Sequence, residues 1–238
     1  MSLAYWNGRL VPDEEVRIGA GDLLGDGLFE TLRVDEGRAG DVEAHLERLF
    51  AGLPRVGIDP PEDLRAAVNA VAEASPWPVA RMRIAVTEET RLISLAAYTP
   101  PVGPVSAVLL PEPWIWSRSP LAGLKSLSYQ ANRLALRRAG VFEALLLNEH
   151  GRLVEGSRSN VILELADGLF TPPLEEGCLP GTVRRRMLEK GEIAERPLTP
   201  EDLRAASRVL LTNSLIGVLE TETKDPKDTK DPRDSKRP

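Results

Sequence analysis

Cysteine and histidine are scarce in this chain of 238 residues, which has one cysteine, Cys178, and two histidines, His45 and His150. A single thiol excludes an intramolecular disulfide and fits a reducing compartment. So few thiol and imidazole groups, widely separated in the sequence, argue against a zinc site and against a Ser-His or Cys-His nucleophile. We therefore expect no bound metal and interpret Cys178 as a small buried or loop residue.

Long apolar runs and an excess of positive charge are also absent. No stretch approaches the roughly 20 apolar residues of a membrane span, and residues 1–9 lack the basic and apolar segments of a signal peptide. The formal net charge of −6 leaves no general basic face for nucleic acid. With 42% hydrophobic residues, the chain can bury a real core. These features predict a cytoplasmic protein that binds neither nucleic acid nor membranes.

What the sequence does contain is a mixture of strand and helix patterns. Residues 27–34 alternate as a strand, whereas residues 42–53 repeat apolar side chains at helical spacing. Asn7-Gly8 predicts the turn of a hairpin over residues 3–11. Further strands are expected at 81–87, 92–98, 105–110, 142–148, 152–155, 160–165, 168–171 and 208–212, and further helices at 62–74, 126–140, 182–190 and 200–206.

Composition also suggests a division into domains. Residues 111–123, rich in proline, tryptophan and serine, follow a predicted strand and indicate a connection between domains. We assign residues 1–113 to an N-terminal α/β domain, 114–123 to the connection and 124–220 to a C-terminal α/β domain. Residues 221–238 contain no aliphatic or aromatic side chain, so we expect a disordered charged tail.

Two segments place small polar residues where a strand or loop meets a helix. They are residues 179–183 (LPGTV) and 212–214 (TNS). Both would offer backbone N–H groups, and the positive end of a helix dipole, to a phosphate. Taken alone, each segment is explained equally well by ordinary helix capping.

A lysine and a glutamate complete the set of chemically suggestive residues. Lys125 begins a predicted helix between the apolar Leu124 and Leu127, a setting that would desolvate its amine. Glu155 ends a predicted strand and precedes Gly156, which lets another group approach closely. Such a carboxylate can pair with a protonated pyridine nitrogen. In isolation, both side chains would be expected at the surface.

Six sequence blocks occur in the order found in class IV aminotransferases, the fold type IV pyridoxal-phosphate enzymes. They are GDGLFETLRV (25–34), AHLERL (44–49), LKSLSYQANRLAL (124–136), EALLLNEHGRLVEGSRSNVIL (143–163), LPGTVRR (179–185) and LLTNSLIGV (210–218). The resemblance covers residues 3–219. It implies a mixed α+β fold of two domains, pyridoxal 5'-phosphate at the domain interface, a small-molecule substrate and a homodimer.

The resemblance also implies a role for individual residues. Lys125 is similar to the family's Schiff-base lysine, Arg48 to its phosphate-binding arginine, and Glu155 to the partner of the pyridine nitrogen. Tyr129 stands where some members contact the phenolic oxygen of the cofactor. The two turns resemble the phosphate cradles, with the cofactor-binding residues Thr182, Val183, Asn213 and Ser214.

Within the family, the chain is most similar to 4-amino-4-deoxychorismate lyases. Thr31 stands where these lyases carry a threonine near the reactive lysine, and TNSLIGV resembles their last block. The implied reaction yields 4-aminobenzoate, a folate precursor, and pyruvate, with Lys125 as the general base and Thr31 assisting protonation. Thr31 could equally be a strand residue chosen for its β propensity.

The alternative is an aminotransferase for D-amino or branched-chain amino acids that uses 2-oxoglutarate. Such an enzyme needs a pocket for the α-carboxylate and for 2-oxoglutarate, to which Arg81, Arg83 or Arg91 could contribute. All three could also be ordinary surface charges, which is the preferred reading for Arg91, and Arg81 and Arg83 remain the candidate substrate-binding residues. The chain departs from the family pattern at Thr182, which is shifted by one position, and at Glu88, where many relatives carry an arginine. These departures concern the substrate more than the cofactor, and the sequence leaves the exact substrate open.

Overall fold

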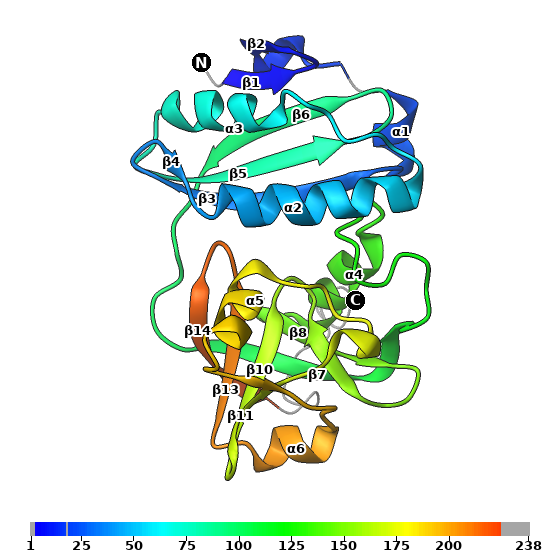
Figure 1. Ribbon diagram of the computed structural model, residues 1–238. Helices are drawn as coiled ribbons and strands as arrows, with labels where there is room; N and C mark the ends of the chain where they lie inside the picture. The colour runs from blue at the N-terminus through cyan, green and yellow to red at the C-terminus, as the bar shows by residue number, and fades with distance from the viewer. Residues whose placement is uncertain (1–2, 18, 225–238) are drawn as a thin grey trace, which may run out of the picture. The chain divides into compact units, whose positions relative to one another are not determined.

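The computed structural model describes residues 3–17 and 19–224, which fold into two compact units (Figure 1). The described residues up to Pro100 form the first unit together with Leu124–Tyr129. The second unit comprises Pro101–Gly123 and the described residues from Gln130 onward. Each unit combines a sheet with helices, which confirms the expected mixed α+β fold class.

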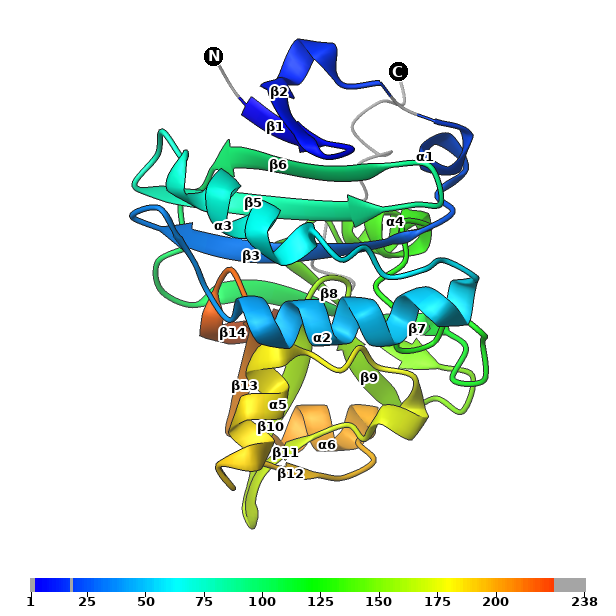
Figure 2. The same cartoon turned by 45° about the horizontal axis from the view of Figure 1, so that its top comes forward.

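The first unit is built on a six-stranded antiparallel sheet in the order β2-β1-β6-β5-β3-β4. Its strands are β1 (Leu3–Trp6), β2 (Arg9–Pro12), β3 (Leu28–Asp35), β4 (Arg38–Ala39), β5 (Val79–Val86) and β6 (Arg91–Ala97). Its helices are α1 (Ala20–Leu24), α2 (Val42–Gly52) and α3 (Leu64–Glu73), with short 3-10 turns at Asp13–Glu15 and Leu53–Val56. Helices α2 and α3 lie along one face of the sheet (Figure 2).

Alternation along β3 decides which side chains face these helices. Leu28, Leu32 and Val34 are buried in the core with residues of α2 and α3, so Phe29, Thr31 and Arg33 point to the opposite face. The hairpin predicted at Asn7-Gly8 is confirmed, because Trp6 pairs with Arg9 and both turn residues have positive φ.

The second unit is built on an eight-stranded sheet in the order β12-β11-β10-β13-β14-β7-β8-β9. Its strands are β7 (Val105–Ile115), β8 (Glu143–Asn148), β9 (Leu153–Gly156), β10 (Asn160–Leu165), β11 (Gly168–Thr171), β12 (Ala194–Glu195), β13 (Arg208–Asn213) and β14 (Gly217–Lys224). Strand β7 runs parallel to both β14 and β8. Its helices are α4 (Gln130–Ala139), α5 (Thr182–Glu189) and α6 (Pro200–Ala205), with a 3-10 turn at Leu174–Glu176.

Helices cover both faces of this second sheet. Helices α4 and α5 pack on one face of the sheet. Helix α4 does so through Ala135 and Ala139, and α5 through Met187 and Leu188. Helix α6 packs on the other face through Leu203.

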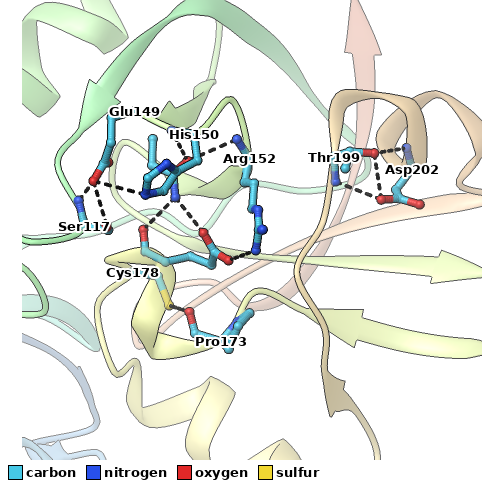
Figure 3. Close-up of polar contacts among 10 residues, drawn as sticks. Ser117, Glu149, His150, Arg152, Pro173, Cys178, Thr199 and Asp202 are labelled. Carbon is cyan, nitrogen blue, oxygen red and sulfur yellow. Dashed lines mark hydrogen bonds and ion pairs between the residues drawn. The ribbon is translucent and has the colours of Figure 1, made fainter.

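The predicted start of α6 is confirmed. Thr199 accepts a hydrogen bond from the backbone of Asp202, and Pro200 follows at the first helical position (Figure 3).

The chain passes between the sheets at points that differ from the sequence-based division. Strand β7 continues to Ile115 and pairs only with strands of the second sheet among the described residues, although residues up to 113 were assigned to the N-terminal domain. The proline-rich segment 100–104, rather than 114–123, therefore links the first sheet to the second.

The segment around Lys125 also differs from the expected start of a helix at residue 126. Ser126 forms an isolated antiparallel bridge with Leu28, and the backbone N–H of Phe29 donates to the carbonyl of Lys125 at 2.8 Å. These pairings extend the segment along β3 in the first unit, so α4 begins only at Gln130.

Four residues that the sequence assigned to a charged tail, 221–224, belong to a strand instead. Thr221–Lys224 belong to β14 and pair with β7, and the Thr221 hydroxyl donates to the carbonyl of Val105 at 2.7 Å. Residues 225–238 lie outside the described part of the chain. No helix in the described residues is long and apolar enough to span a membrane.

Candidate functional site

In the first unit, Lys125 lies against two aromatic rings. Its Nζ is 4.7 Å from the ring centroid of Phe29 and 5.8 Å from that of Tyr129. The two rings meet edge to face, with centroids 5.3 Å apart. The guanidinium of Arg83 lies over the Phe29 ring as well, at 4.7 Å. Phe29, which sequence reasoning did not single out, therefore brings three of the predicted site residues together.

The other predicted residues of this unit follow from the register of β3 and β5. Thr31 pairs with Arg83, and Arg33 pairs with Arg81. Cross-strand neighbours share a face of the sheet. Because Phe29 lies two residues before Thr31, that face carries Thr31, both candidate carboxylate-binding arginines and the ring that holds Lys125.

Arg48 lies on the opposite face of β3, where it binds a buried carboxylate. Its Nε and Nη2 each donate to Glu30 at 2.7 Å. His45, one helical turn earlier on α2, places Nδ1 2.7 Å from the same carboxylate. Burial alone would raise the pKa of Glu30, but the charge of Arg48 and the hydrogen bonds from His45 and Arg48 lower it to about 2.

An ionised Glu30 determines the tautomer of His45 and the orientation of the Arg48 guanidinium. A carboxylate without a proton only accepts, so Nδ1 of His45 carries the proton in that hydrogen bond. The bidentate contact holds the plane of the Arg48 guanidinium and directs Nη1 away from Glu30. Sequence reasoning did not single out Glu30, although its position two residues from both Leu28 and Leu32 puts it on the core-facing side of the strand. The sequence does not show which cation reaches it there.

In the second unit, Glu155 is tied to the predicted phosphate turn. Its Oε2 accepts from the backbone N–H of Leu179 at 2.9 Å, with Nδ2 of Asn160 at 3.5 Å. Asn160 Nδ2 also donates to the carbonyl of Leu179 at 2.8 Å. The candidate partner of the pyridine nitrogen and the segment 179–183 are therefore neighbours within one unit.

The segment 179–183 forms the N-terminal end of α5. Gly181 is the N-cap, Thr182 and Val183 are buried, and the first helical bond runs from Arg185 N–H to the carbonyl of Gly181 at 2.8 Å. A Cβ added at Gly181 would lie 1.9 Å from Oδ1 of Asn160, so the turn needs glycine for this close approach. The N–H groups that come before Arg185 belong to the first turn of the helix. Such groups have no acceptor within a helix and are suited to binding a phosphate.

The segment 212–214 lies beside this turn, because Thr212 pairs with Asn160 across β13 and β10. The side chain of Asn213 shapes the segment: Oδ1 accepts from the N–H groups of Leu215 and Ile216 at 2.9 and 3.1 Å. Its Nδ2 donates to the carbonyl of Arg158 at 3.1 Å. The Asn213 amide is therefore engaged in holding the turn.

A second buried glutamate supports the loop that follows Glu155. Glu143 accepts hydrogen bonds from the hydroxyls of Ser157 and Ser159, the latter at 2.7 Å. A Cβ added at Gly156 would lie 2.8 Å from its carboxyl carbon. Burial raises the pKa of Glu143, and the two serine hydroxyls offset only part of this effect.

Further polar contacts brace the segment before the phosphate turn (Figure 3). Nδ2 of Asn148 donates to Oε2 of Glu176 at 2.7 Å, and Arg152 pairs with the same carboxylate. Glu149 accepts from the backbone and hydroxyl of Ser117. The contacts of Asn148 and Arg152 with Glu176 fix the 3-10 turn Leu174–Glu176, which leads to Cys178 and on to Leu179.

Curated proteins of similar sequence span both expected reactions. The chain is 29% identical to a bifunctional aminodeoxychorismate lyase / D-amino acid transaminase of Mycobacterium tuberculosis, covering 84% of this chain and 82% of that protein. It is 23% identical to a D-alanine aminotransferase of Bacillus licheniformis, covering 92% of this chain and 87% of that protein.

Solved structures that resemble this chain also include both a lyase and an aminotransferase. A 4-amino-4-deoxychorismate lyase from Pseudomonas aeruginosa superposes with a TM-score of 0.77 at 30% identity, covering 93% of this chain and 91% of that one. A hypothetical aminotransferase from Mycobacterium tuberculosis in its PLP-bound form gives a TM-score of 0.81 at 25% identity, covering 93% and 90%. The fold is thus fold type IV and the cofactor is pyridoxal phosphate. Because residues 27–221 match the model of the family Amino-transferase class IV, the chain belongs to that family.

Proposed function

We propose that the chain is a pyridoxal-phosphate-dependent lyase that converts 4-amino-4-deoxychorismate to 4-aminobenzoate and pyruvate. The observation that carries this proposal is the position of Thr31, on the face of β3 that holds Lys125 and next to Arg83. Similarity to the aminodeoxychorismate lyases of M. tuberculosis and P. aeruginosa supports it. As a family member, the enzyme is proposed to be a cytoplasmic homodimer that serves folate biosynthesis.

The described residues fit the cofactor. Bound pyridoxal phosphate supplies an aldehyde that links to an amine and a ring that accepts electrons. Lys125 would form the covalent link, and Glu155 would keep the ring nitrogen protonated. Thr182, Val183, Asn213, Ser214 and Arg48 would hold the phosphate. The close approach at Gly181 and a buried Thr212 hydroxyl without a hydrogen-bond partner in the described chain agree with a ligand at the start of α5.

The residues of the first unit would carry the proton transfers. Phe29 and Tyr129 hold Nζ of Lys125, which takes the proton from the amine-bearing carbon of the substrate. The bond from the neighbouring carbon to the enolpyruvyl oxygen then breaks and the ring becomes aromatic. Lys125 would return the proton that it took, relayed through the Thr31 hydroxyl, to the methylene carbon of the departing enolpyruvate, so that Thr31 ends the step with its own proton and pyruvate leaves. Arg83 and Arg81 bind carboxylate.

The alternative is an aminotransferase acting on D-amino or branched-chain amino acids. The D-alanine aminotransferase and the transaminase half of the bifunctional relative favour it. Lys125, Glu155 and Arg48 would keep their roles, and Arg81 and Arg83 would hold the α-carboxylate of the amino acid. Thr31 would then have no chemical part.

The test is a product assay with purified holoenzyme. Aminodeoxychorismate, generated enzymatically, is supplied while 4-aminobenzoate and pyruvate are measured, with D- and branched-chain amino acids plus 2-oxoglutarate in parallel. Equal release of both products supports the lyase. Glutamate formation from the amino acids without 4-aminobenzoate would establish the aminotransferase.

Variants test the proposed roles of individual residues, independently of which reaction the enzyme catalyses. After reduction with borohydride, the cofactor should be found by mass spectrometry on the peptide that contains Lys125, and Lys125→Ala should remove it. Thr31→Val should slow 4-aminobenzoate release far more than Thr31→Ser, which keeps a hydroxyl. Equal rates in both Thr31 variants would remove that residue from the mechanism. Glu155→Gln should retain the cofactor but react slowly, and an unchanged rate would contradict its role.

A further inference from the structure

The hydroxyl of Thr212 is buried without a partner. Thr212 is 1% exposed, and its Oγ1 makes no hydrogen bond within the part of the chain that the structure describes. A buried hydroxyl that loses its water and gains no partner destabilises the fold. Such a group needs an explanation, and a ligand atom that completes the hydrogen bond is the simplest one.

The hydroxyls of nearby buried threonines do have partners. Thr171 donates to the carbonyl of Val161 at 2.8 Å, and Thr221 donates to the carbonyl of Val105 at 2.7 Å. All three threonines lie in strands of the same sheet. Backbone carbonyls accept from the buried hydroxyls of Thr171 and Thr221. Among these three threonines, Thr212 differs because its hydroxyl has no hydrogen-bond partner in the described residues.

Strand register places Thr212 at the start of α5. It pairs with Asn160 across β13 and β10, and cross-strand neighbours share a face. Ile162 and Leu210, two residues away on each strand, pack against Met187 and Leu188 near the end of α5. The chain therefore carries Thr212 and Asn160 toward the opposite, N-terminal end of that helix.

Contacts of Asn160 confirm the direction. Its Nδ2 donates to the carbonyl of Leu179, and its Oδ1 occupies the space that a side chain at Gly181 would need. The neighbouring Asn213 cannot take the same role with its amide, which is engaged with Leu215, Ile216 and Arg158. The Thr212 hydroxyl therefore lies on the face of the sheet that α5 covers, beside the residue that contacts the N-terminal end of this helix.

We propose that the Thr212 hydroxyl donates a hydrogen bond to an oxygen of the phosphomonoester group bound at the N-terminus of α5. This inference rests on the proposed function, which puts the phosphate of the cofactor there. Phosphate oxygens accept from helix N–H groups and from hydroxyls. The sequence placed Thr212 in the predicted phosphate turn 212–214 for its backbone, but named Asn213 and Ser214, and not the Thr212 hydroxyl, as cofactor-binding groups.

The test is Thr212→Val, which keeps the shape of the side chain and removes the hydroxyl. Two effects of opposite sign are expected. The melting temperature of the apoprotein should rise, because an unsatisfied buried hydroxyl is lost. The ratio of the dissociation constants for pyridoxal and pyridoxal phosphate should fall about tenfold, because one hydrogen bond to a charged oxygen is lost.

Two variants serve as controls. Thr212→Ser keeps the hydroxyl and should retain the wild-type preference for pyridoxal phosphate. Thr171→Val removes a hydroxyl that has a partner, so it should lower the melting temperature of the apoprotein and leave the preference unchanged.

Each remaining outcome overturns the inference in a distinguishable way. If Thr212→Val leaves the preference for pyridoxal phosphate unchanged, Thr212 is not a phosphate ligand, whether the melting temperature rises or falls. If the wild-type apoprotein itself shows no preference for pyridoxal phosphate over pyridoxal, the proposed phosphate site fails first, and the role of Thr212 fails with it.

Discussion

Two buried glutamates, one in each unit, are held in opposite ways. Glu30 in the first unit accepts from two nitrogens of Arg48 and from His45, all at 2.7 Å. Glu143 in the second unit accepts from the hydroxyls of Ser157 and Ser159, and its ion pair with an arginine is longer, at 3.9 Å. Both side chains are 1% exposed or less.

The difference shows how the partners of a buried acid set its charge. Burial raises the pKa of both carboxyls, but only Glu30 has close cationic or donating partners strong enough to lower its pKa, to about 2. The proposed phosphate-binding arginine of the first unit is thus anchored by charge. The loop after Glu155 in the second unit is anchored by neutral hydrogen bonds.

Removing the charge should cost very different amounts of unfolding free energy at the two glutamates, although both are buried. Glu30→Gln leaves Arg48 without its counter-ion, and removing one partner of a buried pair costs about 3–5 kcal/mol. We expect the lower end, because the Arg48 side chain is 13% exposed. Glu143→Gln, the matched control, keeps an acceptor for the serine hydroxyls and should change stability by about 1 kcal/mol or less. Urea unfolding of both apoproteins at pH 7 measures this, and equal losses would refute the distinction.

The pH dependence of stability should have opposite signs at the two sites. The pKa of Glu30 is lower in the folded protein than the ordinary 4.5, so its stabilisation is complete above pH 4.5 and disappears toward about pH 2. The deficit of Glu30→Gln relative to wild type should therefore shrink as the pH falls through that window. The raised pKa of Glu143 stabilises the fold below pH 4.5, and this stabilisation is lost as the pH rises.

Consequently, Glu143→Gln should gain stability relative to wild type as the pH increases above 4.5. Unfolding curves of the three proteins in a common buffer series give both differences. A Glu143→Gln variant whose difference from wild type stays flat would mean that Glu143 does not bind its proton more tightly in the folded state.

Local sequence patterns predicted much of this arrangement. The alternation in residues 27–34 and the Asn7-Gly8 turn follow from backbone geometry that neighbouring residues determine. The resemblance to the family placed Lys125 and Tyr129, which the structure brings to one ring, and Glu155, which it ties to segment 179–183.

The remainder depends on contacts between residues far apart in the chain. Glu30 and His45 are 15 positions apart, and neither a strand glutamate nor a lone histidine indicates a buried partner. Strand β7 pairs in parallel with β14, more than 100 residues later, so nothing local assigns it to the second sheet. For the same reason Lys125 was expected at a helix start, although the next residue, Ser126, bridges to Leu28 and α4 begins only at Gln130.

A packing variant tests whether the second unit relies on close neutral contacts at its site. Gly181→Ala would put Cβ 1.9 Å from Oδ1 of Asn160, whose amide is held by Leu179. Overpacking of this kind costs typically 1–3 kcal/mol. Gly40→Ala is the control, because its Cβ would meet only the carbonyl of Arg33 at 3.6 Å. Thermal unfolding should show a loss for Gly181→Ala alone, and Asn160→Ser should recover part of it in the double variant.

The last prediction concerns chemical reactivity and not the free energy of unfolding, at the buried thiol of Cys178 in the second unit. Burial first, and the negative charge of Glu155 next, raise the pKa of its thiol to about 12. Roughly one molecule in ten thousand would carry a thiolate at pH 8, so iodoacetamide should label the folded apoprotein far more slowly than the protein in urea.

Cys178→Ala serves as the labelling blank, because the chain has no other cysteine. Mass spectrometry over time at pH 8 gives both rates. Fast labelling of the folded protein would mean either that the segment before Leu179 opens or that this interior stabilises an anion. In the second case the contrast with Glu30 would fail, because the second unit would then tolerate buried negative charge without a cation in close contact.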